Sequence, residues 1–201
     1  MRRRPMQQRS QERFDALVDA AGHLVSEKGV DDVSMTDIAA QAGVALTAAY
    51  RYFPNKQSVI RELALRSFEA DYAVLQAFSD RGDKPLRDWI EEVVRTYCNA
   101  EVDNAGRLQL RAAVHANVEL AQLNFEDSRT KAGQVAAALI DAGVAVPRPE
   151  LEQRALLLIK LFDGAISLAR AVEPDQAEST IDRFARLASG FLLDGSDPTR
   201  G

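Results

Sequence analysis

Cysteine and histidine, the residues that most often act as nucleophiles or metal ligands, are scarce in this sequence. The chain contains one cysteine, Cys98, and two histidines, His23 and His115, and no catalytic motif surrounds any of them. Nucleophilic catalysis needs a base and an orienting group beside the nucleophile, and a zinc site needs several ligands at a regular spacing. The Gly-x-Gly fingerprint of a dinucleotide cofactor is also absent from the sequence. We therefore expect no catalytic residues, no metal and no cofactor.

A stronger pattern lies in the N-terminal quarter of the chain, where two short helices are predicted around a glycine. Ser34 and Asp37 have the spacing of a capping box, which predicts a helix that begins after Ser34. Gly43 ends that helix, because a tight turn at this point requires a positive φ. The second helix ends at Phe53, since the residue before a proline avoids the α region and Pro54 follows. Two short helices joined by such a turn are typical of a helix-turn-helix.

The second short helix is predicted to have an inner and an outer face. The side chains expected on the inner face, at helical spacing, are Leu46, Ala49, Tyr50 and Phe53. Those expected on the outer face are Thr47, Ala48, Arg51 and Tyr52. Small side chains let the helix backbone approach the floor of a DNA groove, their methyl groups can contact thymine, and Arg51 can reach guanine acceptors or phosphate. The outer face is therefore predicted to read DNA.

Lys56 supplies a separate argument for a phosphate contact. Asn55 is a suitable N-cap for the next helix, so Lys56 lies in the first helical turn, where the helix dipole disfavours a cation. A DNA phosphate at this place would satisfy both the free N–H groups and the ammonium. Further phosphate contacts are expected from the hydroxyl groups of Thr36, Tyr50 and Tyr52.

The charge of the chain is unevenly distributed. The formal net charge is −5, whereas the first thirteen residues contain five arginines and one glutamate. An acidic protein with one basic end can present that end to a polyanion. Arg2, Arg3 and Arg4 are expected to reach along or into the minor groove; a solubilising tail is the alternative interpretation.

The remaining sequence predicts an all-α fold in the cytoplasm. Apolar stripes with helical spacing recur up to about residue 193, and no alternating pattern is long enough for a confident strand. The later helices are expected over about residues 106–123, 127–141, 150–172 and 177–193. No apolar run is long enough for a membrane span, and polar residues follow the N-terminal arginines in place of the apolar region of a signal peptide.

Residues from about 14 to 63 resemble the DNA-binding domain of the tetracycline-repressor (TetR) family. The matching features are Ser34, Asp37-Ile38-Ala39, Ala42-Gly43-Val44 and Tyr50-Arg51-Tyr52-Phe53-Pro54-Asn55-Lys56. The resemblance implies that the second short helix enters the major groove, and that Tyr50, Tyr52 and Lys56 bind the DNA backbone. Ala45 stands where the family often has a capping Ser or Thr, so one capping or phosphate contact is expected to be absent. The candidate DNA contacts are Arg2, Arg3, Arg4, Ser34, Thr36, Ala45, Leu46, Thr47, Ala48, Tyr50, Arg51, Tyr52 and Lys56.

The resemblance also implies a division into two domains. Residues 1–55 would bind DNA, and residues 56–201 would bind an effector and dimerise, the effector shifting the fourth helix. Candidate contacts to a largely apolar small molecule come from the middle helices: Phe68, Tyr72, Trp89, Tyr97, Arg111, His115, Phe125 and Phe162. Ordinary core packing is the alternative role for each of these residues.

The helix expected over residues 150–172 is apolar around most of its circumference, so it needs cover on two sides. Its own domain can cover one side. The resemblance implies that a second copy of the chain covers the other, in a homodimer built from the last two long helices. The candidate interface residues are Leu158, Phe162, Ala165, Ile166, Ala169, Ile181, Phe184, Ala188 and Phe191.

Together with the family resemblance, these patterns predict a homodimeric repressor that binds a palindromic operator and is released by a small-molecule effector. Two other classes stay open. The first is a ligand-binding or interaction protein whose helix-turn-helix no longer binds DNA. The second is an enzyme that uses Cys98 or His115.

Overall fold

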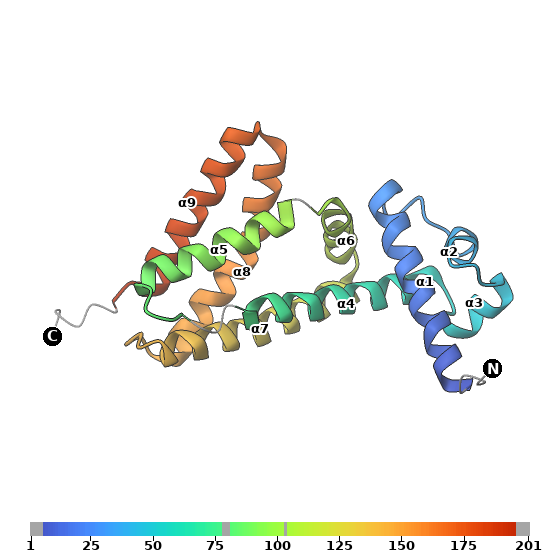
Figure 1. Ribbon diagram of the computed structural model, residues 1–201, viewed down its shortest axis with the longest axis horizontal. Helices are drawn as coiled ribbons and strands as arrows, with labels where there is room; N and C mark the ends of the chain where they lie inside the picture. The colour runs from blue at the N-terminus through green and yellow to red at the C-terminus, as the bar shows by residue number, and fades with distance from the viewer. Residues whose placement is uncertain (1–5, 78–80, 103, 196–201) are drawn as a thin grey trace. The chain divides into compact units, whose positions relative to one another are not determined.

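The computed structural model describes residues 6–77, 81–102 and 104–195 (Figure 1). Over these residues the chain forms α-helices and no strand, which confirms the all-α fold class. The helices are α1 (Met6–Lys28), α2 (Met35–Gln41), α3 (Leu46–Tyr52), α4 (Lys56–Ala77), α5 (Leu86–Val102), α6 (Ala105–Ala116), α7 (Val118–Asp141), α8 (Arg148–Ala171) and α9 (Pro174–Leu193). None of the described helices is both long and apolar enough to cross a membrane.

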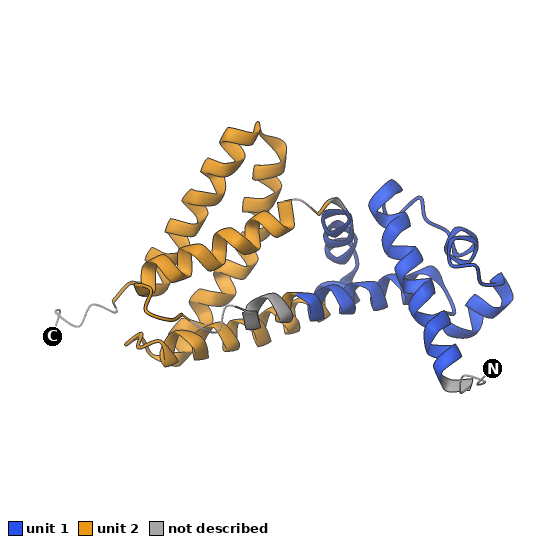
Figure 2. Cartoon of the chain, viewed as in Figure 1, with its two compact units in different colours: residues 1–70, 105–121 blue, residues 71–104, 122–201 orange. Residues whose placement is uncertain are grey.

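The helices pack into two compact units, and α4 and α7 each run from one unit into the other (Figure 2). The first unit contains α1, α2, α3, the N-terminal part of α4, α6 and the first residues of α7. The second contains the end of α4, α5, the rest of α7, α8 and α9. Helix α6 therefore belongs with the N-terminal helices in packing, although it follows α5 in the sequence. The functional division between residues 55 and 56 stays a prediction.

In the first unit, α1 buries the apolar stripe that its sequence predicts. The buried residues of this stripe are Leu17, Val18, Ala21, Leu24 and Val25. Phe14 is half-buried and stacks on Phe53, with ring centroids 4.8 Å apart. Burial of one large apolar side chain contributes roughly 1.5–3 kcal/mol. This contribution is what holds α2 and α3, because helices of two turns are not stable alone.

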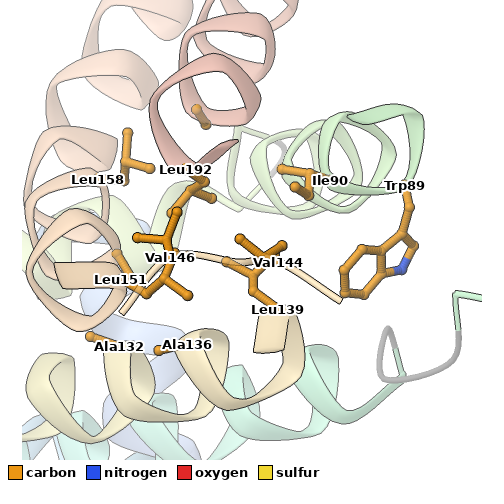
Figure 3. Packing of buried hydrophobic residues seen from close by; sticks show 12 residues of the cluster. Trp89, Ile90, Ala132, Ala136, Leu139, Val144, Val146, Leu151, Leu158 and Leu192 are labelled. Carbon is orange, nitrogen blue, oxygen red and sulfur yellow. The ribbon is translucent and has the colours of Figure 1, made fainter. Parts of the chain in front are cut away.

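The second unit has a core in which α5, α7, α8 and α9 meet (Figure 3). Trp89 and Ile90 come from α5, and Val144 and Val146 come from the loop between α7 and α8. Gly143 ends α7 with φ +94°, a conformation that glycine adopts without strain. A second cluster farther along α5 contains Cys98, Phe162, Ile166, Ala169 and Ile181.

The structure corrects two predicted helix boundaries. Helix α6 ends at Ala116 and α7 begins at Val118, whereas the sequence pattern predicts a break near residues 123–127. Asn117 explains the actual position, because its Oδ1 accepts a hydrogen bond from the N–H of Leu120 at 3.0 Å, as an N-cap does. Helix α9 begins at Pro174, three residues before the predicted start, because proline is favoured in a first helical turn.

Candidate nucleic-acid interface

The start of α2 is fixed by the predicted capping box. Ser34 Oγ accepts a hydrogen bond from the Asp37 N–H at 3.2 Å, and Asp37 Oδ2 accepts one from the Ser34 N–H at 3.0 Å. Lys28, the last residue of α1, donates to the same carboxylate oxygen at 3.0 Å. Hydrogen bonds from the Ser34 hydroxyl, then from Lys28 and the Ser34 N–H, lower the pKa of Asp37 from 3.8 to about 2. The carboxylate thus joins the end of α1 to the beginning of α2.

Replacing Ser34 with alanine tests this cap. We expect Ser34→Ala to lower the free energy of unfolding by about 1 kcal/mol at neutral pH, because a helix N–H loses its acceptor. The folded-state pKa of Asp37 lies below its ordinary value, so the carboxylate stabilises the fold above pH 3.8 and this contribution disappears as the pH falls towards about 2. Ser34 is the main cause of the lowered pKa. The stability difference between the wild type and Ser34→Ala should therefore narrow in that window.

Urea unfolding near neutral pH and at about pH 3 measures both effects. Ser179→Ala, at an exposed position inside α9, is the matched control, since Ser179 caps no helix. The role of the cap is contradicted if the wild type and Ser34→Ala have the same free energy of unfolding at neutral pH. It is also contradicted if their difference is as large at about pH 3 as at neutral pH.

The turn between α2 and α3 has the geometry that the sequence predicts. Gly43 has φ +64°. Its N–H donates to the Ala40 carbonyl at 3.1 Å, and the Val44 N–H donates to the Ala39 carbonyl at 2.9 Å. These are the two hydrogen bonds of a Schellman motif, which satisfies carbonyl groups at a helix end. The motif reverses the chain tightly and fixes α3 against α2.

The face that α3 presents differs from the predicted one. Ala49 and Phe53 are buried as predicted, but Leu46 is exposed and Tyr50 is 49% exposed. The reason is that Phe53 has already left the helix, with φ −132° and ψ 111°. Because Phe53 is not helical, its burial does not mean that Leu46 and Tyr50, at helical spacing from it, lie on the buried face of α3. The exposed face of α3 is consequently wider and more aromatic than the sequence pattern indicates.

Tyr52, predicted to point outward, is half-buried against α1. Its ring makes an edge-on contact with Phe14, with centroids 6.5 Å apart. Its hydroxyl oxygen accepts a hydrogen bond from the Ser10 hydroxyl at 3.2 Å. Tyr52 therefore holds α3 on α1, and its hydroxyl lies beside a residue near the N-terminus of the described chain.

Most of the remaining candidates on and near α3 are exposed. Ala48 is half-buried, and the exposed candidates are Ser34, Thr36, Ala45, Leu46, Thr47, Tyr50 and Arg51. Ala45 is the N-cap of α3 and makes no side-chain capping hydrogen bond, as its departure from the family pattern predicts. Arg2, Arg3 and Arg4 lie outside the described residues.

Lys56 has partners in its own chain. Its Nζ donates to the carbonyl oxygens of Val30 at 2.9 Å and Asp31 at 3.1 Å. Asn55 caps α4 as predicted, since its Oδ1 accepts the N–H of Ser58 at 2.9 Å. An ammonium group has three N–H donors, so Lys56 can hold the loop between α1 and α2 and still donate to a phosphate. Nothing in the local sequence around Lys56 indicates this second role.

Most residues expected at the subunit interface are buried inside the protomer. Those already covered by their own chain are Leu158, Phe162, Ile166, Ala169, Ile181 and Ala188. Ala165 and Phe184 are half-buried, and Phe191 is exposed beneath Arg154, whose guanidinium lies 5.7 Å from its ring centroid. Besides Phe191, the exposed large apolar side chains of this helix pair are ones that the sequence pattern did not single out: Leu157, Leu161, Leu168 and Leu187. The predicted stripe is the face that packs on the protomer's own core.

The candidate effector contacts do not form one cluster within the second unit. Tyr97 and Phe162 pack together, with ring centroids 4.8 Å apart, whereas Trp89 lies in the separate core shown in Figure 3. Phe125 is exposed beneath the ammonium of Lys160, which lies 5.6 Å from the centroid of its ring. The candidates within the first unit are Phe68 on α4 and Arg111 and His115 on α6.

The second unit contains a buried ion cluster that the sequence pattern does not predict. Lys131 Nζ lies 2.7 Å from carboxylate oxygens of both Asp71 and Asp127. The ammonium also lies 5.2 Å from the ring centroid of Tyr72. Burial and, next, a hydrogen bond to Asp127 raise the pKa of the Tyr72 phenol to about 12. Asp127 and Lys131 are four residues apart on α7, a spacing that predicts an ion pair on one helix face. No such local spacing links them to Asp71 on α4.

The first unit thus combines a capped α2, a tight glycine turn and an α3 whose polar and aromatic face is exposed. Joined to further helices, this arrangement defines the class of helix-turn-helix transcriptional regulators.

Comparisons with known proteins agree with this class. Residues 17–63 match the model described as bacterial regulatory proteins, tetR family, and residues 84–194 match a tetracyclin repressor-like C-terminal domain. The HTH-type transcriptional regulator BetI of Agrobacterium fabrum is 30% identical over 185 residues, which cover 90% of this chain and 75% of BetI. The chain belongs to the TetR family, whose members are DNA-binding transcriptional regulators and not enzymes.

Solved structures share the fold at lower sequence identity. A regulator assigned to the TetR family from Mesorhizobium loti superposes with a TM-score of 0.73 at 20% identity, covering 92% of this chain and 97% of that one. A transcriptional regulator from Rhodococcus sp. Rha1 gives a TM-score of 0.71 at 21% identity, covering 92% and 97%. These likenesses support the fold alone.

Proposed function

We propose that this chain is a cytoplasmic repressor that binds a palindromic operator as a homodimer and is released by a small-molecule effector. The family membership supports DNA binding. The observation that carries the proposal for this chain is the exposed face of α3, where Thr47, Tyr50 and Arg51 project from a helix fixed at both ends. A helix held in this way can enter the major groove without reorganising, which keeps the cost of binding low.

The side chains on this face have distinct proposed roles. Arg51 donates to guanine acceptors, and the methyl group of Thr47 contacts thymine. The hydroxyls of Thr36 and Tyr50, with the remaining donor of Lys56, bind phosphates and fix the register of the helix. Affinity from phosphate contacts falls steeply with salt, whereas base contacts set the sequence preference.

A dimer explains the exposed leucines of the last two helices. Leu157, Leu161 and Leu168 recur on α8 at intervals of four and seven residues, so they lie on one helix face. Leu187 and Phe191, four residues apart on α9, add apolar surface. Exposed apolar side chains concentrated on two adjacent helices are typical of an interface. Two copies joined through this face carry two α3 helices, one for each half-site of a palindromic operator, whose half-sites lie about 34–36 Å apart.

The base-reading role of Arg51 is tested with a duplex recovered by in vitro selection from a random library. We expect Arg51→Ala to weaken binding by roughly 5- to 150-fold, which corresponds to about 1–3 kcal/mol, and to relax the preference at one base position. Arg183→Ala, an exposed position on α9 with the same change of charge, is the control and should leave binding nearly unchanged.

The same titration separates the competing classes. If the wild type enriches no duplex and does not bind random DNA even at low salt, the helix-turn-helix is vestigial and the proposed function is refuted. Equal effects of Arg51→Ala and Arg183→Ala indicate a purely electrostatic contribution and remove the base-reading role of Arg51.

A further inference from the structure

Within the described residues of the first unit, two of the exposed large apolar side chains lie on α3. Leu46, the first residue of this helix, is 37% exposed, and Tyr50 is 49% exposed. Residues four apart share one face of a helix, so these two side chains form a single apolar edge. Because more than a third of Leu46 remains in water, packing within the first unit does not account for a leucine at this position.

The exposed face of α3 has an apolar edge and a polar edge. Successive helical residues are rotated by about 100°, which places Leu46 and Tyr50 together at one side of the exposed arc. Thr47 and Arg51 lie at the other side, and Ala49 is buried on the opposite face of the helix. The proposed function uses the polar edge. From the apolar edge it uses only the hydroxyl of Tyr50, so Leu46 still has no role.

The backbone that carries Leu46 is fixed by hydrogen bonds on both sides. The Schellman turn at Gly43 precedes it. The Ala45 carbonyl accepts the N–H groups of Ala48 at 2.8 Å and Ala49 at 3.0 Å, which closes the first turn of α3. Residues at the N-terminal end of a recognition helix are those that contact base edges. When α3 enters the major groove, Leu46 therefore meets the bases without reorganisation of its backbone.

An aliphatic side chain can recognise only one group on the base edges of the major groove. Leu46 has no hydrogen-bond donor or acceptor, and the C5-methyl group of thymine is the apolar group presented there. Cytosine lacks this methyl group and presents an N4 donor, which Leu46 would bury without an acceptor. We propose that Leu46 selects a thymine in each operator half-site through its C5-methyl group. This inference rests on the proposed function and names the base feature that the apolar edge of α3 reads.

The experiment replaces each thymine of the selected duplex in turn with deoxyuridine, which lacks only the methyl group. At one position of a half-site, the replacement should weaken wild-type binding by roughly 3- to 10-fold, the loss expected for one methyl group that is no longer buried. Leu46→Ala should bind the thymine and deoxyuridine duplexes equally at this position. Cytosine placed there should weaken wild-type binding further, and 5-methylcytosine should bind more tightly than cytosine.

Two control variants separate the Leu46 contact from other effects. Thr47→Ser removes the neighbouring methyl group that is also proposed to contact thymine, so its effect should fall on a different base. Val118→Ala shortens an exposed apolar side chain elsewhere in the first unit and should keep the wild-type response to deoxyuridine. If Leu46→Ala does not fold, Leu46→Val makes a smaller change, and the loss on deoxyuridine replacement should shrink in that variant.

Three results would overturn the proposal. The first is that the selected half-sites contain no thymine or that deoxyuridine never weakens wild-type binding. The second is that the folded Leu46 variant loses as much affinity as the wild type at every replaced thymine. The third is that 5-methylcytosine binds no better than cytosine. Failure of the proposed function is distinguishable, because then selection recovers no duplex.

Discussion

Replacing Lys131 with methionine is expected to lower the free energy of unfolding by about 3–5 kcal/mol. The ammonium lies 2.7 Å from carboxylate oxygens of both Asp71 and Asp127, and all three side chains are about nine-tenths buried. Methionine fills a similar volume but leaves two buried carboxylates without this cation. Urea unfolding followed by circular dichroism measures the change.

An exposed ion pair provides the control for Lys131→Met. Lys84 pairs with Glu92, and both side chains are about half exposed, so Lys84→Met should cost no more than about 1 kcal/mol. The double variant Lys131→Met/Asp71→Leu should recover part of the lost free energy of unfolding. It leaves one buried carboxylate without the Lys131 ammonium, whereas Lys131→Met alone leaves two. A loss for Lys131→Met no larger than that for Lys84→Met would contradict the buried cluster.

The Asp71–Lys131 contact is one of two ion pairs that hold α4 to other helices. Asp71 lies near the end of α4 in the second unit, where Lys131 binds it to α7. The beginning of α4 is held in the first unit, where Arg66 pairs with Asp15 of α1. Helix α4 is thus held by an ion pair in each unit; in the proposed function, an effector that alters the Asp71–Lys131 contact would act on a helix that also belongs to the first unit. A coupling of this kind is typically about 1–3 kcal/mol.

Local signals in the sequence were sufficient for the helix-turn-helix. The capping box of Ser34 and Asp37, the glycine turn at Gly43 and the N-cap at Asn55 each involve residues no more than five apart, and each has the predicted geometry. Such signals depend on backbone chemistry that nearby residues determine alone. The Asn117 cap was equally local, and the apolar pattern around it concealed it.

Signals that depend on distant packing could not be read in the same way. Asp71 and Lys131 are sixty residues apart, and no local pattern links them. The outward direction of Tyr50 and the inward direction of Tyr52 depend on where α3 ends and on Phe14, which belongs to another helix. Periodicity identifies the apolar faces of a helix but not which of them the protomer's own core covers.

Charge substitutions on α8 can test which of its apolar faces lies in the proposed dimer interface. Leu161 is 49% exposed on α8, while Ile166, five residues later, is 3% exposed. In the proposed dimer, Leu161→Glu places a charge in the interface of each subunit. We expect dimerisation to weaken by about 3 kcal/mol or more, roughly 100-fold in the dimer dissociation constant. Sedimentation should then detect monomers with an unchanged helical content.

Two control variants separate dimer loss from unfolding. Val118→Glu adds the same charge at a position on α7 that is 86% exposed, and it should remain a dimer. Ile166→Glu places the charge inside the protomer, so it should lower the melting temperature sharply, whereas Leu161→Glu should not. A Leu161→Glu protein that sediments like Val118→Glu would place the interface elsewhere. A folded monomer carries one α3 helix, so it should also lose the tight binding to a two-half-site duplex that a dimer with two such helices provides.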